Sequence, residues 1–114
     1  MKTLADIQLA ELDRQAIVAA GALLRRDHPV ARILLFGSKA TGRDTPESDI
    51  DLLVLTYRPL TWRERDAITD ALFEVEMEYD VVISTLIVSA EEWEHGPYQV
   101  LAIRDEVERH GVAA

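Results

Sequence analysis

The segment Asp49–Thr56 constrains the fold most, because it is an apolar run that begins with two carboxylates. Successive side chains of a β-strand point to opposite faces of the sheet, so Asp49 and Asp51 share one face. The alternate residues make the other face wholly apolar: Ile50, Leu52 and Val54. Aspartate is uncommon in strands and costly to bury without a partner. The segment therefore predicts a strand with a buried apolar face and a carboxylate pair at its entry end.

Helical and strand-like segments alternate along the rest of the chain. Apolar spacing predicts a helix over about residues 3–27, strands at Ala31–Phe36, Asp49–Thr56 and Asp80–Val88, a turn or short helix at Ser38–Gly42, a helix from Thr61 to about Met77 and one around Tyr98–Arg109. Thr61–Glu64 and Ser89–Glu92 have the capping-box form, and Gly111 is expected to end the last helix in a left-handed conformation.

The order of these segments predicts an α/β or α+β domain in which helices cover one sheet. No internal repeat or linker stands out in the sequence. We therefore expect a single domain over residues 1–114, with an N-terminal helix at about 3–27 and a core at about 30–110.

The charge balance limits the partners that we expect. The 114 residues include 12 basic and 21 acidic side chains, a net charge of −9. Such a chain repels nucleic-acid phosphates and favours divalent cations or a basic protein partner. There is no cysteine to form a disulfide or bind a metal. Because neither a secretory signal nor an apolar run of membrane-spanning length is visible, we expect a cytoplasmic protein without membrane contact.

Gly37 and Ser38 lie between the first two predicted strands, where a phosphate group can bind. Glycine has no Cβ, so backbone N–H groups can approach an anion closely, and the Ser38 hydroxyl can donate a hydrogen bond. Asp49 and Asp51, about 7 Å apart along one strand face, can both reach one Mg²⁺ ion. Taken singly, a Gly-Ser turn or an Asp-x-Asp pair is usually structural. The joint order of strand, Gly-Ser, spacer and Asp-x-Asp is more specific.

These residues resemble the signature of the DNA polymerase β-like nucleotidyltransferase superfamily. The matching residues are Phe36-Gly37-Ser38 and Asp49-Ile50-Asp51-Leu52. The stretch GSKATGRDTPESDIDLLV is especially similar to the minimal nucleotidyltransferases of bacteria and archaea, and DVV and GPYQVLAIRDEVERHGV extend the resemblance over most of the chain from Ala31 onward. The resemblance implies a polymerase β-like fold, a small mixed β-sheet with helices packed on it.

The resemblance also implies site residues and cofactors. Members of the family use three carboxylates and two Mg²⁺ ions, which clamp the attacking and leaving oxygens of the reaction, and ATP is the expected substrate. Asp49 and Asp51 match the first two carboxylates. Asp80 matches the third, and Glu78, which has the same strand parity, is the alternative. The expected nucleotide-binding residues are Gly37, Ser38, Lys39 and Arg43, although the two cations are also compatible with ordinary surface positions.

Three functions remain open from the sequence. The first is transfer of AMP from ATP to a hydroxyl group of a protein, because some minimal nucleotidyltransferases are antitoxins that adenylylate a helical HEPN toxin on a tyrosine. The second is a binding module that neutralises a helical partner by contact alone. The third is a nucleotide sensor that binds ATP without transferring it. The intact motif favours transfer. A homo-oligomer remains open.

Other chemistry-bearing residues give weaker signals. His28, His95 and His110 do not have the spacing of metal ligands, so they are read as surface or helix-end residues. Trp62 and Trp93 each stand at the start of a predicted helix, where a packing role is the simpler interpretation.

Overall fold

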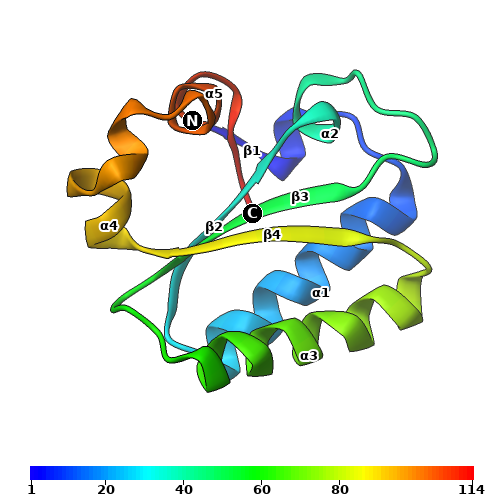
Figure 1. Ribbon diagram of the computed structural model, residues 1–114. Coiled ribbons are helices and arrows are strands. Elements are labelled where there is room, and N and C mark those ends of the chain that lie inside the picture. The colour runs from blue at the N-terminus through cyan, green and yellow to red at the C-terminus, as the bar shows by residue number, and fades with distance from the viewer.

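Five strands form a single mixed sheet with the order β1-β5-β2-β3-β4 in the computed structural model (Figure 1). The structure describes the backbone of residues 1–114 and all side chains except those of Gln99 and Val100. The strands are β1 Lys2–Thr3, β2 Val30–Phe36, β3 Ile50–Thr56, β4 Ile83–Ser89 and β5 Val112–Ala113. β2 is antiparallel to β3 and β5, whereas β3 is parallel to β4 and β1 is parallel to β5.

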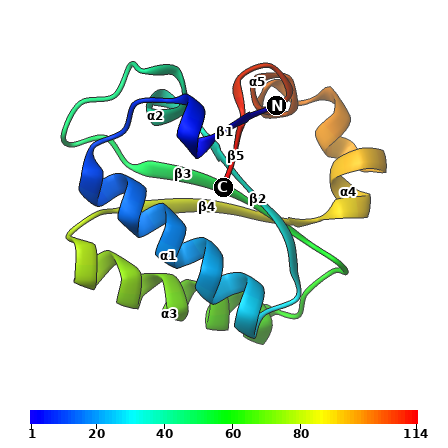
Figure 2. The same cartoon turned by 180° about the vertical axis from the view of Figure 1, so that it is seen from behind.

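Helices cover both faces of this sheet. The two long helices α1 (Glu11–Asp27) and α3 (Trp62–Tyr79) lie side by side on one face, and α4 (Ala90–His95) and α5 (Ala102–His110) lie on the other (Figures 1 and 2). The short helix α2 (Ser38–Thr41) follows β2, and two 3₁₀ turns, Leu4–Asp6 and Pro97–Val100, precede α1 and α5. The expected mixed sheet with helices packed on it is confirmed.

The strand β3 separates two apolar cores, as its alternating pattern predicts. Ile50, Leu52 and Val54 are buried in the core beneath α1 and α3. Leu53 and Leu55 are buried in the second core, together with Trp93 of α4 and Val107 of α5. Since Asp51 has the same parity as Leu53, its carboxylate is on the α5 side of the sheet. The face assignment made from the sequence is therefore confirmed.

Both predicted capping boxes are present. Thr61 accepts from the Glu64 N–H at 3.2 Å while the Glu64 carboxylate accepts from the Thr61 N–H at 3.0 Å. Ser89 and Glu92 form the equivalent pair at the start of α4. Trp93 is buried as expected, but Trp62 is 68% exposed, so the packing role expected of Trp62 is wrong.

Three expected boundaries are wrong. The first helix begins at Glu11 and not near residue 3, because residues 1–10 form β1, a 3₁₀ turn and an extended stretch. The Arg14 guanidinium holds this stretch by donating to the Ile7 carbonyl at 2.9 Å. β4 begins at Ile83 and not at Asp80, because α3 continues to Tyr79 and needs a connection before the sheet.

The last helix begins at Ala102, after the 3₁₀ turn, and not at Tyr98. Gly111 ends it with φ −62°, so the expected left-handed conformation is wrong. A glycine still fits there for a different reason, since a Cβ at this position would overlap the Val107 carbonyl.

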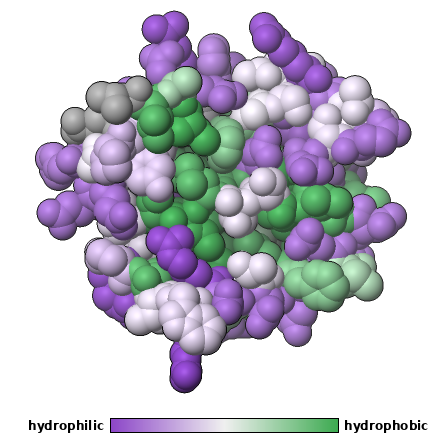
Figure 3. All heavy atoms as spheres, in the orientation of Figure 1, coloured by the Kyte–Doolittle hydropathy of each residue, from purple (hydrophilic) through white to green (hydrophobic). Residues whose placement is uncertain are grey.

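On the face shown in Figure 3, hydrophobic side chains are exposed toward the middle and hydrophilic side chains surround them. Exposed apolar side chains include Phe73 and Met77 of α3 and Val82, which precedes the edge strand β4. Within the described part of the chain, every helix is too short or too polar to cross a lipid bilayer.

Candidate functional site

The turn after β2 places Gly37 against Asp51. Phe36 pairs with Asp51 across the antiparallel strands β2 and β3, so the next residue passes beside the aspartate side chain. Gly37 has φ 76° and ψ −158°, a conformation that is essentially restricted to glycine. A Cβ on Gly37 would overlap the Asp51 Oδ2 atom. The Gly-Ser turn and the carboxylate pair, eleven residues apart in sequence, are therefore in contact in the fold.

The short helix α2 fixes the shape of this turn. The Ala40 N–H donates to the Gly37 carbonyl at 3.1 Å, and the Arg43 N–H donates to the Ser38 carbonyl at 3.0 Å. Gly42 ends the helix in the left-handed conformation, with φ 75°. These contacts hold the half-buried Ser38 at the surface of a cleft.

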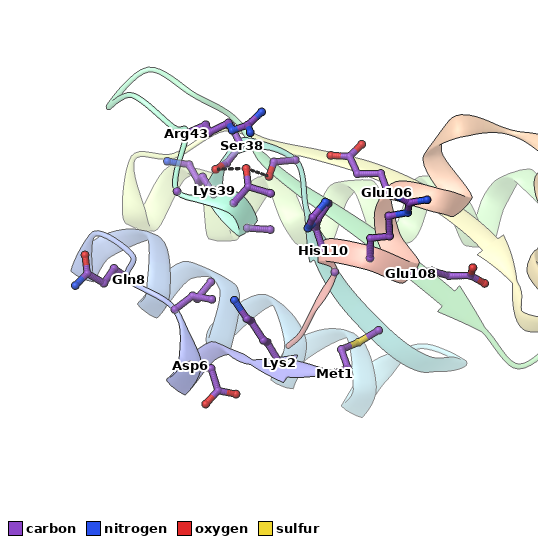
Figure 4. A pocket seen from close by; sticks show the side chains of 17 residues that line it. Met1, Lys2, Asp6, Gln8, Ser38, Lys39, Arg43, Glu106, Glu108 and His110 are labelled. Atoms are coloured by element: carbon purple, nitrogen blue, oxygen red, sulfur yellow. Dashed lines mark hydrogen bonds between the residues drawn. The ribbon is translucent and has the colours of Figure 1, made fainter.

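The cleft has a volume of about 750 Å³, within the range of small-molecule sites. One wall is the Gly37–Arg43 turn, and the others come from the C-terminal part of α5 and from the first residues of the chain (Figure 4). The Glu106 carboxylate points from α5 toward the turn that carries Ser38 (Figure 4). Asp49 and Asp51 are not among the described residues that line the cleft, and Asp51 adjoins it through Gly37, which does line it.

The carboxylates at this end of β3 are electrostatically crowded. Partial burial, together with the negative charges of Asp49 and Glu106, raises the pKa of Asp51 above its usual value. Asp49 itself is exposed just before β3. A divalent cation would relieve this repulsion, and oxygen donors from Asp49, Asp51 and Ser38 are the kind that Mg²⁺ prefers. The donor set therefore fits one such ion.

Lys39 has a structural environment. Its ammonium is buried and lies 2.8 Å from Asp13 of α1 and 3.3 Å from Asp44 in the following loop. Burial alone would lower the pKa of Lys39, but the hydrogen bonds and charges of Asp13 and Asp44 outweigh this effect and raise it. In this arrangement the ammonium faces two carboxylates, whereas the neighbouring Arg43 is exposed and lines the cleft.

Asp80 lies apart from the other two aspartates. It caps the C-terminus of α3 in the left-handed conformation, with φ 54°, and lines a separate hollow with Asp13 and residues 46–48. Glu78 is exposed in the last turn of α3, so the strand parity expected for it is wrong. Within the described residues, no three acidic or histidine side chains gather closely enough to hold a metal ion. The structure therefore does not bring Asp80 together with Asp49 and Asp51.

The residue on β4 that faces Asp51 is Ser84. The two are register partners on parallel strands, so their side chains share a face of the sheet. A ligand role for Asp80 remains a prediction.

Sequence reasoning did not identify several ionisable residues of the cleft. Lys2, Glu106 and His110 line it, from β1 and from α5. His110 had been assigned only a surface or helix-end position. No spacing rule connects Lys2 or Glu106 with the Gly-Ser turn, because the sheet order that brings them together depends on the pairing of β5 between β1 and β2.

Comparisons with known proteins agree with this geometry. A family model described as "Nucleotidyltransferase domain" matches residues 20–110. The Methanocaldococcus jannaschii protein named "Putative protein adenylyltransferase MJ0141" is 33% identical over 81 residues, which cover 71% of this chain and 75% of that protein.

Solved structures share the fold. One described as a "putative minimal nucleotidyltransferase" matches with a TM-score of 0.60 and 28% identity, covering 90% of this chain and 95% of the other. Another, described as a "toxin-antitoxin with AMP-PNP", matches with a TM-score of 0.59 and 21% identity, covering 87% and 69% of the two chains. With a matching family model over most of its length and a Gly-Ser turn built against a carboxylate pair, the chain belongs to the nucleotidyltransferase domain family.

Proposed function

We propose that this nucleotidyltransferase transfers AMP from Mg·ATP to a hydroxyl group of a protein acceptor. The observation that carries the proposal is the contact between the Asp51 carboxylate and Gly37, a residue that lines a cleft of about 750 Å³. It joins the two halves of the motif, one suited to phosphate and the other to a cation.

Each group has a distinct role in this reaction. Ser38 donates to a phosphate oxygen, and Arg43 at the cleft mouth offers positive charge to the same chain of phosphates. Asp49 and Asp51 would hold a divalent cation, which would neutralise phosphate charge. The acceptor oxygen then forms a bond to the α-phosphorus and loses its proton to water, the bond from that phosphorus to its bridging oxygen breaks, and pyrophosphate leaves. Positioning and charge neutralisation supply most of the catalysis of such a transfer.

A protein acceptor is supported by the charge distribution. Between Arg65 and Arg104 the chain has no lysine or arginine but nine aspartates and glutamates. Exposed apolar side chains stand within this acidic stretch, including Phe73, Met77 and Val82. Such a surface attracts a basic protein, because complementary charge accelerates encounter and selects partners, and it repels nucleic-acid phosphates.

The related proteins support the same acceptor class. The M. jannaschii relative is named a protein adenylyltransferase, and structural neighbours are described as toxin-antitoxin proteins, one of them with AMP-PNP. On this basis the partner that we propose is a helical toxin of the HEPN type, encoded beside this protein and modified on a hydroxyl side chain.

A second function is favoured by one observation. Ser84 occupies the β4 position that faces Asp51, and Asp80 lies apart from the pair. With a serine at this β4 position in place of a third strand carboxylate, the protein would bind nucleotide and neutralise its partner by contact, with weak transfer or none. This binding module is the alternative to the transferase.

The two functions separate in one experiment. The purified protein is incubated with Mg·ATP and the product of the adjacent reading frame, and the intact mass of that product is measured. The proposed function predicts one or more added AMP units, which are absent when Asp49→Asn replaces the wild type. Asp70→Asn, an exposed change on α3, is the control for loss of one negative charge.

An unmodified partner that is nevertheless inhibited in a stable complex would support the contact-only module. Nucleotide addition to RNA or DNA in the same mixture would show that the acceptor class is wrong.

A further inference from the structure

Five of the first eight residues form the wall of the cleft opposite the Gly37–Arg43 turn (Figure 4). Met1, Lys2, Asp6, Ile7 and Gln8 all line it. These residues lie outside the segment 20–110 that matches the family model. This wall is therefore a feature of the present chain that the family match does not describe.

We propose that the Lys2 ammonium binds the phosphate chain of the nucleotide, so that strand β1 contributes a ligand-binding residue to the site. This inference rests on the proposed function, since it assumes that a nucleotide occupies the cleft. It assigns a phosphate ligand on the side of the cleft that faces Ser38.

The sheet holds Lys2 in place. β1 pairs with β5, with Lys2 opposite Val112, so Lys2 stands beside the chain that leaves α5 after His110. In Figure 4 the Lys2 side chain extends from β1 toward the space below the Ser38 turn, on the same side as His110. The hydrogen bond from Arg14 to the Ile7 carbonyl fastens the segment to α1. Lys2 therefore projects from a supported strand.

Three acidic residues line the cleft with Lys2, namely Asp6, Glu106 and Glu108. Hydrogen bonds from Thr3 and, to a smaller extent, the charge of Lys2 lower the pKa of Asp6. Asp6 accepts hydrogen bonds from the Thr3 N–H at 2.8 Å and its hydroxyl at 3.2 Å, and its carboxylate points away from the cleft (Figure 4). Glu108 forms a salt bridge with Arg104 at 2.6 Å. The Glu106 side chain points toward the turn that carries Ser38 and away from Lys2 (Figure 4).

Most other cations of the cleft are also engaged. Lys39 is bound by Asp13 and Asp44, and Arg109 forms a salt bridge with Asp105 at 3.0 Å. Among the described residues, Lys2 and Arg43 are the lining lysine and arginine without a salt bridge. A triphosphate in a chain of net charge −9 needs such groups, and they stand on opposite walls.

The test compares Lys2→Gln with Arg26→Gln by titration calorimetry. Both substitutions remove one positive charge from an exposed side chain, but Arg26 is in the last turn of α1 and does not line the cleft. The ligands are Mg·ATP, inorganic tripolyphosphate and adenosine, at one ionic strength. Lys2→Arg is the conservative variant.

For Lys2→Gln we expect the Kd of Mg·ATP and of tripolyphosphate to rise about fivefold or more. The Kd of adenosine should stay within about twofold, because the nucleoside lacks the phosphate charge that Lys2 binds. Lys2→Arg should restore most of the affinity, and Arg26→Gln should behave as wild type.

Unchanged Mg·ATP affinity in Lys2→Gln, or an equal loss in Arg26→Gln, would overturn the role of Lys2 and leave the proposed function standing. Failure of the wild type to bind any of the phosphate ligands would overturn the proposed function, and the Lys2 assignment with it.

Discussion

The Asp51 side chain is placed where its charge weakens the fold. Burial and the neighbouring charges of Asp49 and Glu106 raise its pKa. A carboxyl whose pKa is higher in the folded than in the unfolded state lowers stability as pH rises through that interval. This is the opposite of a salt-bridged aspartate, and it is expected where a carboxylate is held for binding a cation.

Replacing Asp51 by Asn should therefore stabilise the protein at neutral pH. We expect a higher Tm for Asp51→Asn than for wild type at about pH 7 without divalent cations, and equal values at about pH 3, below the ordinary aspartate pKa. Added Mg²⁺ should narrow the difference, since binding stabilises only the wild type. Scanning calorimetry across pH measures this, and a lower Tm for Asp51→Asn at neutral pH would contradict the electrostatic account.

The need for glycine at position 37 can be tested by comparison with Gly42, which ends the same turn. Gly37→Ala introduces both a forbidden backbone conformation and an overlap with Asp51 Oδ2, whereas a Cβ on Gly42, with φ 75°, meets nothing within 4 Å. We expect a loss of about 1 kcal/mol for Gly42→Ala and at least about 2 kcal/mol for Gly37→Ala by urea denaturation.

A double variant isolates the overlap between the two residues. Combining Gly37→Ala with Asp51→Ala removes the clashing carboxylate, so the two losses should not add. Simple additivity would show that Asp51 is not in contact with Gly37 in solution.

At the scale of elements, the buried ion pair between Lys39 and Asp13 joins α2 to the start of α1. The Lys39 side chain is 2% exposed, and the two charged atoms are 2.8 Å apart. The pair holds the Gly37–Arg43 turn at a fixed position relative to a long helix. Removing one member of such a pair leaves an unpaired buried charge, which is strongly destabilising.

We therefore expect Lys39→Met to lose about 3 kcal/mol of unfolding free energy, measured with urea. Replacing both members, as Lys39→Met with Asp13→Leu, should recover part of that loss because the buried Asp13 charge is removed together with its cation, although Asp44, the more exposed partner, keeps its charge. A Lys39→Met protein of wild-type stability that no longer binds ATP would instead identify Lys39 as a phosphate ligand.

The sequence predicts this site only where the relevant signals are local. The capping boxes at Thr61 and Ser89 and the alternation of β3 depend on neighbouring residues, and the structure confirms them. The start of β4 was misplaced, because Asp80-Val81-Val82 has strand-like composition but serves as the exit from α3.

Long-range features of the site were not predictable from the pattern. The pairing of Lys39 with Asp13 spans 26 residues, and the approach of Lys2 to the cleft depends on β5 at the other end of the chain. Neither contact has a spacing rule, since both follow from how the sheet order folds distant segments together.

At the scale of the whole molecule, the net charge of −9 opposes the binding of an anionic nucleotide in the cleft. The acidic surface suits a basic protein partner, while the site must bind a polyanionic nucleotide. Under the proposed function, a divalent cation at Asp49 and Asp51, with Lys2 and Arg43 on opposite walls of the cleft, would make the two compatible. The central claim is therefore that nucleotide binding depends on a divalent cation held by Asp49 and Asp51.

Titration of Mg·ATP into wild type and into the double variant Asp49→Asn with Asp51→Asn tests this claim most directly. The double variant removes two negative charges and keeps the shape of the strand, and circular dichroism verifies its fold. We expect saturable binding by the wild type and a loss of affinity of about tenfold or more in the variant. Equal affinity for Mg·ATP in the two proteins would contradict the account.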